Sequence, residues 1–221
     1  MGILELHHVG YIYSTKYQKV EALKDVSCVF ETGLLQAIVG RSGSGKTTLL
    51  SLMAGLDLPS SGEILCAGKP TSSMKLDEYR RDKAAVIYQN FRLLPLLTVA
   101  ENVMYPMELK GMNARAARKK ATELVARVGL PESVLNRYPA LLSGGEQQRV
   151  AIARALGMDT KILLADEPTG NLDTANGENI FRILQSLAHD NGYCVIVVTH
   201  DDGMAARADR ILKLEDGRAV R

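Results

Sequence analysis

The chain has 221 residues, of which 46% are hydrophobic, and its formal net charge is +2. This length and composition predict one globular domain with a full core, and a charge so close to zero argues against a nucleic-acid partner. No apolar run approaches the ~20 residues of a membrane-spanning helix, and no secretion signal opens the chain. We therefore expect a cytoplasmic protein that reaches a membrane only through a partner.

The first part of the chain predicts strands around a glycine-rich turn. Residues 3–13 and 22–33 alternate between apolar and polar side chains, a pattern typical of antiparallel strands. The apolar run at 36–40 predicts a buried strand, and the apolar spacing over 46–56 predicts a helix. The turn between them therefore joins the end of a strand to the start of a helix.

The middle of the chain changes character. Strands are predicted at 62–68 and 84–89, and helical patterns dominate from about residue 90 to 140. Prolines interrupt these patterns at Pro95, Pro106, Pro131 and Pro139, so we expect an inserted helical lobe. The basic run at 115–120 is interpreted as the solvated face of an amphipathic helix in this lobe.

The last part alternates between helices and strands. The predicted elements are a helix at 144–157, a strand at 162–166, a helix at 174–190 and strands at 194–200 and 210–217. Such alternation predicts a mainly parallel sheet covered by helices, with functional loops at the carboxyl ends of the strands. The three cysteines, Cys28, Cys66 and Cys194, lie far apart in strand-like segments, and we interpret them as reduced core residues.

Residues 40–47 read GRSGSGKT and match the pattern of a phosphate-binding loop. Glycines let the backbone curl so that successive N–H groups face a triphosphate, and the start of a helix favours an anion. Lys46 supplies a positive charge for the phosphates, and Thr47 supplies a hydroxyl for magnesium. The predicted nucleotide-binding residues of this loop are Gly40, Arg41, Ser42, Gly43, Ser44, Gly45, Lys46, Thr47 and Thr48. The alternative, a plain connecting turn, is disfavoured by the placement of the lysine and the threonine.

An acidic pair follows the aliphatic strand ILLAD at 162–166. At the end of such a strand Asp166 is suited to holding magnesium through water, and Glu167 is suited to polarising an attacking water. Acidic pairs at strand ends are common, so the pair is weak evidence alone. Its occurrence together with a phosphate-binding loop favours the catalytic interpretation.

A second anion site is predicted where Ser143, Gly144 and Gly145 precede a strongly helical run. The alternative is a serine N-cap with glycines for tight packing. Because one triphosphate already fills the first loop, a second anion clamp should approach the γ-phosphate from the opposite side. The residues alone leave open whether it does so within the chain or from another copy.

These motifs, with NLD at 171–173 and VVTH at 197–200, resemble in order and spacing those of ATP-binding cassette ATPases over essentially the whole chain. The resemblance implies an α/β fold of the P-loop NTPase class, with a mainly parallel sheet, an N-terminal antiparallel β subdomain and an inserted α-helical subdomain. It implies one domain over residues 1–221, with its core at 1–89 and 141–221 and the helical subdomain at about 90–140. ATP and Mg²⁺ are the implied cofactors.

The resemblance also implies that two copies pack head to tail. Ser143, Gly144 and Gly145 of one subunit close on the ATP held by the other, and Asp173 lies in the loop that crosses the interface. Glu146 departs from the family pattern, because glutamine is frequent at that position. This departure adds a negative charge near the anion clamp.

Single residues receive roles from the same resemblance. Tyr13 matches the aromatic residue that stacks on adenine, with Tyr11 and Tyr17 as rivals. Gln89 matches the glutamine that touches magnesium and the attacking water, and His200 matches the histidine that senses the γ-phosphate. The implied catalytic set is Glu167, His200, Gln89 and Lys46, and the implied magnesium set is Thr47, Gln89 and Asp166.

LLPLLTVAENV at 93–103 and LLADEPTGNLD at 163–173 most resemble the subgroup of macrolide exporters, lipoprotein-release systems and antimicrobial-peptide resistance transporters. In that subgroup the ATPase is a separate chain paired with a permease. The implied partner is therefore an integral membrane subunit that contacts about 90–111, at the cytoplasmic face of a bacterial membrane. In this segment we expect a lobe core of Leu93, Leu94, Leu96 and Leu97 and a docking groove with Phe91, Tyr105 and Met107.

Other functions remain open at this point. The ATPase of a cell-division or cell-wall signalling complex shares these motifs, and so do soluble cassette proteins that act on ribosomes or DNA. A small-molecule kinase also uses a phosphate-binding loop, but it leaves LSGGEQQRV and the acidic pair unexplained.

Overall fold

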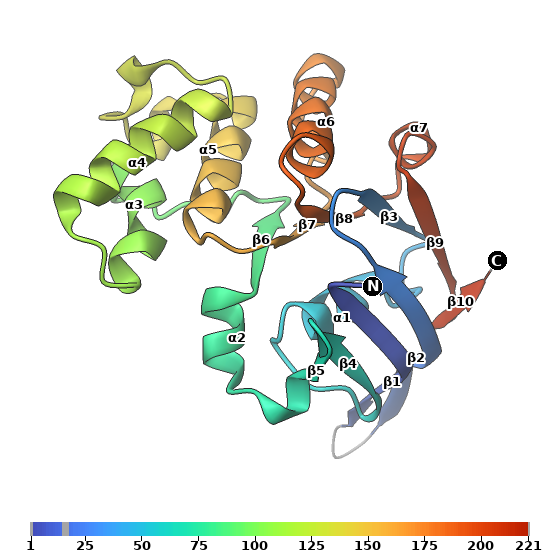
Figure 1. The fold of residues 1–221 in the computed structure, drawn as a ribbon. Coiled ribbons are helices and arrows are strands. Elements are labelled where there is room, and N and C mark those ends of the chain that lie inside the picture. The colour runs from blue at the N-terminus through green and yellow to red at the C-terminus, as the bar shows by residue number, and fades with distance from the viewer. Residues whose placement is uncertain (1, 15–17, 221) are drawn as a thin grey trace.

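The computed structural model describes residues 2–14 and 18–220 of the chain. Within these residues the strands form two sheets (Figure 1). The smaller sheet is antiparallel in the order β2-β1-β4-β5, with β1 (Leu4–Ser14), β2 (Lys19–Phe30), β4 (Ser61–Cys66) and β5 (Lys69–Pro70). The predicted N-terminal antiparallel strands are therefore confirmed.

The larger sheet is parallel except at one edge. Its order is β10-β9-β3-β8-β7-β6, with β3 (Leu35–Val39), β6 (Ala84–Tyr88), β7 (Ile162–Asp166), β8 (Cys194–Val198), β9 (Arg210–Glu215) and the antiparallel edge strand β10 (Arg218–Val220). β8 is wholly buried and β7 is buried up to its last residue, which explains their continuous apolar sequences. Parallel strands bring their carboxyl ends to one edge, so the loops after β3, β6, β7 and β8 meet there.

Alternate residues of β7 and β8 fill two different cores. Leu164 and Ile196 belong to the cluster shared with the antiparallel sheet and α1 (Lys46–Met53). Leu163 and Val195 belong to the cluster shared with the helices on the other face. Because successive side chains of a strand point to opposite faces, these strands supply both cores at once.

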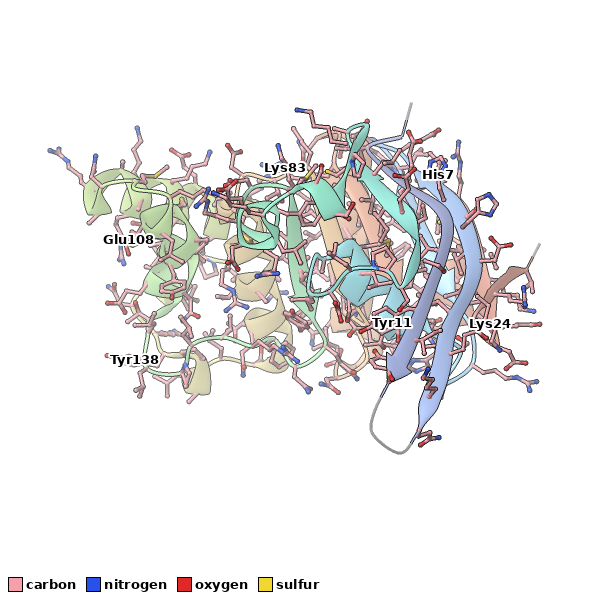
Figure 2. All side chains as sticks on the ribbon, turned by 90° about the horizontal axis from the view of Figure 1, so that it is seen from below. His7, Tyr11, Lys24, Lys83, Glu108 and Tyr138 are labelled. Carbon is pink, nitrogen blue, oxygen red and sulfur yellow. The ribbon has the colours of Figure 1, made fainter. Side chains whose placement is uncertain are left out.

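The second core is covered by helices that gather beside β6 and β7 (Figure 1). These are α3 (Val99–Leu109), α4 (Ala114–Arg127), α5 (Gly144–Gly157) and α6 (Thr174–His189). Figure 2 shows Glu108 and Tyr138 at the helical end of the molecule, away from Tyr11 and Lys24 on the antiparallel strands. An inserted layer of helices is thus present, and α5, which begins beyond residue 140, packs on both α3 and α4.

One helix contradicts the sequence interpretation of its proline. Pro106 was expected to interrupt the helical pattern, but α3 continues through it to Leu109. Proline removes a single backbone hydrogen bond, and the close packing of α5 supports the helix at this point. A Cβ on Gly157 would lie 2.9 Å from the carbonyl oxygen of Val103 and 3.4 Å from Cγ of Pro106. Glycine therefore lets the two helices approach closely.

Several short elements were not predicted from the sequence. These are α2 (Leu76–Asp82), α7 (Asp202–Ala205), β5 and β10, together with three 3₁₀ turns among the described residues. The basic run at 115–120 lies on α4, where Lys119 is exposed while Ala117 and Ala121 are buried, as an amphipathic helix requires. All the cysteines are free; Cys66 and Cys194 are buried, and Cys28 is half-buried. Within the described residues, no helix has the length and apolar character that crossing a membrane demands.

Candidate nucleotide-binding site

A cavity of about 890 Å³ opens where the carboxyl ends of the parallel strands meet the antiparallel sheet. It brings together most of the predicted site residues: Tyr13, Ser42, Gly43, Gly45, Lys46, Thr47, Thr48, Gln89, Asp166, Glu167 and His200. Sequence reasoning missed seven further lining residues, which are Val20, Glu21, Ala22, Lys24, Val198, Asp216 and Gly217. Lys24 carries no motif, whereas Asp216 and Gly217 form a turn signal that predicts a bend but not a site.

The glycine-rich loop between β3 and α1 has the backbone that a phosphate cradle needs. Gly43 and Gly45 adopt φ angles of 80° and 100°, in the left-handed region. A Cβ on Gly45 would lie 2.6 Å from the carbonyl oxygen of Ala22, while that of Gly43 would meet open space. Inside the loop the buried Oγ of Ser44 has no hydrogen-bond partner among the described residues. The loop therefore fits a phosphate group, and it sits on the N-terminus of α1.

Lys46 lies at the first position of α1 with only 8% of its surface exposed. Its Nζ donates hydrogen bonds to the carbonyl oxygens of Gly40 at 2.7 Å and Arg41 at 3.0 Å. These bonds hold the ammonium group across the loop, and an ammonium group has a third donor to offer an anion. Thr47, the next residue, lines the same cavity.

The acidic pair stands at the carboxyl end of β7. Burial raises the pKa of Asp166, and the neighbouring charge of Glu167 raises it further. Glu167 has a φ of 48°, and its N–H donates to the carbonyl oxygen of Val198 at 2.9 Å. Such left-handed backbone is uncommon for a non-glycine residue and is typical of functional sites.

The oxygens around the cavity fit a magnesium ion that is shared with phosphate groups. No cluster of three acidic, histidine or cysteine side chains suited to a metal occurs in the part of the chain that the structure describes. Thr47 and Asp166 nevertheless both line the cavity, as does the carboxamide of Gln89. Mg²⁺ commonly takes one or two protein oxygens and completes its shell with water and phosphate. These residues fit that pattern.

His200 follows β8 and pairs with Glu167. Its Nδ1 lies 2.5 Å from Oε2 of Glu167. This hydrogen bond and the negative charge of Glu167 both raise the pKa of His200 above its ordinary value. Sequence reasoning named both residues but gave no sign that they touch.

Gln89 follows β6 and faces the loop after Glu167. Its Nε2 donates to Oδ1 of Asn171 at 3.3 Å. Ser143 to Gly145 and Asp173, by contrast, do not line the cavity of their own chain. Ser143 is the N-cap of α5 in a capping box with Glu146, and Asp173 is the N-cap of α6. The site within one chain thus lacks the second anion clamp.

A model of the ABC transporter family matches residues 23–170, which is more than half of the chain. This chain belongs to the ABC transporter family. A cassette of this family binds and hydrolyses ATP, so the predicted fold class, ATPase activity and ATP cofactor are confirmed.

Individual relatives extend the match over the whole cassette. The ABC transporter ATP-binding protein YclH of Bacillus subtilis is 41% identical, covering 98% of this chain and 95% of its own length. The macrolide export ATP-binding/permease protein MacB of Salmonella typhimurium is 43% identical over 99% of this chain. The cassette spans only 34% of the length of MacB.

Solved structures agree with the fold. A dimeric post-hydrolysis state of the cassette MJ0796 with ADP and Pi superposes with a TM-score of 0.90 at 40% identity, covering 99% of this chain and 97% of that one. The protein cbiO1 of Clostridium perfringens, part of the transporter complex cbiONQ, gives a TM-score of 0.89 at 28% identity, covering 100% and 87%. Both likenesses extend over the antiparallel sheet, the parallel sheet and the helical layer of this cassette.

The tyrosines considered for stacking on adenine lie at different places in the structure. Tyr13 lines the cavity of the cassette, is 47% exposed, and its hydroxyl lies 3.2 Å from Oγ1 of Thr48. Tyr11 packs edge-on against Tyr13 at 4.8 Å and is tied to Asp57 by a hydrogen bond, outside the cavity. Tyr17 lies outside the described residues. The position of Tyr13 therefore supports its assignment.

The Glu167–His200 contact predicts a measurable pKa change. We expect Glu167→Gln to lower the pKa of His200, because the charge that stabilises the imidazolium is removed. In the unchanged cassette the ion pair is fully present below pH ~6.5 and is lost as the pH rises through the raised pKa of His200. An NMR pH titration of the four histidines measures this, with His200→Ala identifying the signal. An unchanged His200 pKa in the Gln variant would mean that the two side chains are apart in solution.

Proposed function

We propose that the cassette is the ATP-hydrolysing subunit that drives a separate membrane permease, and that two copies close around two ATP molecules. One observation carries the proposal. The phosphate loop, Glu167 and His200 share one cavity, whereas Ser143 to Gly145 lie at the N-terminus of α5 outside it. A second copy is needed to bring that N-terminus to the phosphates. MJ0796, the similar cassette, has been solved as a dimer.

Within one cavity the residues divide the chemistry of phosphoryl transfer. Lys46 and the N–H groups of the loop hold the phosphates, and Tyr13 supports the adenine. Glu167 orients the attacking water, and His200 contacts the γ-phosphate. Thr47, Asp166 and Gln89 hold magnesium, which neutralises phosphate charge when it is bound. Positioning and electrostatics supply the catalysis.

The second copy completes each site. The hydrogen-bond donors are the Ser143 hydroxyl and the N–H groups of Gly144 and Gly145. They stabilise the negative charge of the γ-phosphate that the partner holds. Ser143 Oγ accepts the N–H of Glu146 at 3.3 Å, which places the hydroxyl at the start of α5. Asp173 lies at the interface between the copies. Glu146 is occupied in the capping box, where the N–H of Ser143 lowers its pKa and keeps it ionised.

The permease contacts the segment at about 90–111, on the helical subdomain that we assign to about 90–140. The expected distribution of its leucines is wrong in part: Leu96 is 87% exposed and Leu94 is 36% exposed. Met107, expected in the groove, is instead buried in the core of the lobe. Tyr105, on the same segment, is 45% exposed. Exposed apolar residues on a helical lobe support a docking surface for another protein.

The cellular location of the cassette and its subgroup within the family are proposed from this permease partner. We place the cassette at the cytoplasmic face of a bacterial membrane, held there by its permease, and in the subgroup of the macrolide exporters. MacB supports this assignment because its name joins ATP-binding and permease functions in one protein.

Affinity purification from solubilised membranes tests the proposal. A tagged cassette should recover an integral membrane protein in stoichiometric amount, and reconstitution with it should raise the ATPase rate. Leu96→Glu, on an exposed position, should reduce both effects without lowering the melting temperature. Recovery of ribosomes or DNA in place of a membrane protein would overturn the proposal in favour of the soluble cassette class.

A further inference from the structure

We propose that Asn171 is a positioning residue that holds the carboxamide of Gln89 at the nucleotide cavity. The inference rests on the proposed ATPase function and deepens it. Gln89 lines the cavity, whereas Asn171 does not and acts through it.

The contacts between the two residues are reciprocal. Gln89 Nε2 donates to Asn171 Oδ1 at 3.3 Å, and Asn171 Nδ2 donates to the backbone oxygen of Gln89 at 3.2 Å. The same Nδ2 donates to Oδ1 of Asn90 at 2.8 Å. One asparagine thus binds both ends of Gln89, which fixes the side chain relative to its own backbone.

Gly170 closes the other side of the carboxamide. A Cβ on Gly170 would lie 2.6 Å from Nε2 and 3.2 Å from Cδ of Gln89. The Gln89 carboxamide therefore lies close against Gly170, and from this narrow position its Nε2 donates to Oδ1 of Asn171. Shape and hydrogen bonding select the same rotamer.

The loop that carries Asn171 also carries Glu167. The N–H of Gly170 donates to the carbonyl oxygen of Glu167 at 3.1 Å, and the N–H of Leu172 donates to that of Thr169 at 3.0 Å. These tight turns connect the residue that orients water to the residue that holds Gln89. Glu167 and Asn171 therefore lie on one short loop that is held by its own backbone hydrogen bonds.

The backbone after Gln89 is fixed independently of Asn171. Phe91 and Arg92 have φ angles of 55° and 48°, and Arg154 of α5 donates to both of their carbonyl oxygens, at 3.0 Å and 2.6 Å. This clamp holds the chain as it enters the helical layer. Loss of Asn171 should consequently release the Gln89 side chain and leave the backbone in place.

Asn171→Ala tests the assignment, because the residue is exposed and its removal leaves no buried gap. We expect kcat to fall about tenfold while KM for ATP stays within about twofold, as for other residues that orient a ligand-binding group. Asn136→Ala is the matched control, since Asn136 is also exposed and accepts a side-chain hydrogen bond, from Arg118 at 2.8 Å. It should keep the parental kcat.

A double-mutant cycle separates positioning from general structure. If Asn171 acts through Gln89, Asn171→Ala should have no further effect on kcat in a Gln89→Ala background. Gly170→Ala, which displaces the same carboxamide from the opposite side, should behave in the same way. Full additivity in the cycle, or a kcat of Asn171→Ala within about twofold of the parent, would overturn the inference. Absence of ATP hydrolysis by the parent, alone and with its permease, would instead overturn the proposed function.

Discussion

Glu167→Gln is expected to lower the ATP turnover number by about 10²–10⁴-fold while ATP still binds, because a positioned general base contributes that much. The carboxylate lies in the cavity beside Asp166 and bonds His200 at 2.5 Å. Glutamine keeps the shape and loses the charge that orients and polarises water. Steady-state phosphate release and equilibrium binding of a fluorescent ATP analogue measure the two quantities separately.

Glu108→Gln is the matched control for this experiment. Glu108 is an exposed glutamate on α3, at the helical end of the molecule (Figure 2). The same substitution there should leave the turnover and ATP binding of the isolated cassette unchanged. Hydrolysis by Glu167→Gln at close to the parental rate would show that another group orients the water.

Lys46→Met should weaken ATP binding by about 10- to 150-fold, the equivalent of the ~1.5–3 kcal/mol of a hydrogen bond to a charged group. Methionine keeps the length of the side chain at this nearly buried position and removes its charge. The loop loses the bonds from Nζ to Gly40 and Arg41 as well as the cation that faces the phosphates. Isothermal titration with a non-hydrolysable ATP analogue measures the change in Kd.

Lys75→Met serves as the control for Lys46→Met, because Lys75 is a lysine whose side chain is 82% exposed, beside α2, and pairs with Glu78. It should bind the analogue with parental affinity. Equal affinity of the Lys46 variant and the parent would contradict the assignment of the phosphate loop, provided that the melting curve shows a folded variant.

Much of the fold was predictable because several helices and strands carry clear local signals in the sequence. The helix at 144–157 was predicted with its observed bounds, since Ser143 and two glycines precede an uninterrupted helical run, and in the structure Ser143 caps this helix in a capping box with Glu146. The strand at 162–166 was equally clear, because four aliphatic residues precede an acid. Neither element depends on distant parts of the chain for its start and end.

Contacts between distant segments were not predictable in this way. The pair Glu167–His200 and the pair Gln89–Asn171 join separate loops, and no periodicity reports which loops meet. The leucines of 93–97 show the same limit: an apolar pattern does not tell the inside of a helical lobe from a surface that another protein covers, and Leu96 is exposed.

The central claim is that ATP joins two copies of the cassette, and the mass of the Glu167→Gln variant tests it most directly. One chain has a mass of 24.1 kDa. Light scattering after size exclusion should give one chain without ATP and twice that mass with saturating ATP and Mg²⁺. Adding Ser143→Arg, which blocks the donors at the start of α5, should return the variant to one chain. A Glu167→Gln variant that stays at the mass of one chain with saturating ATP, even beside its permease, would contradict the account.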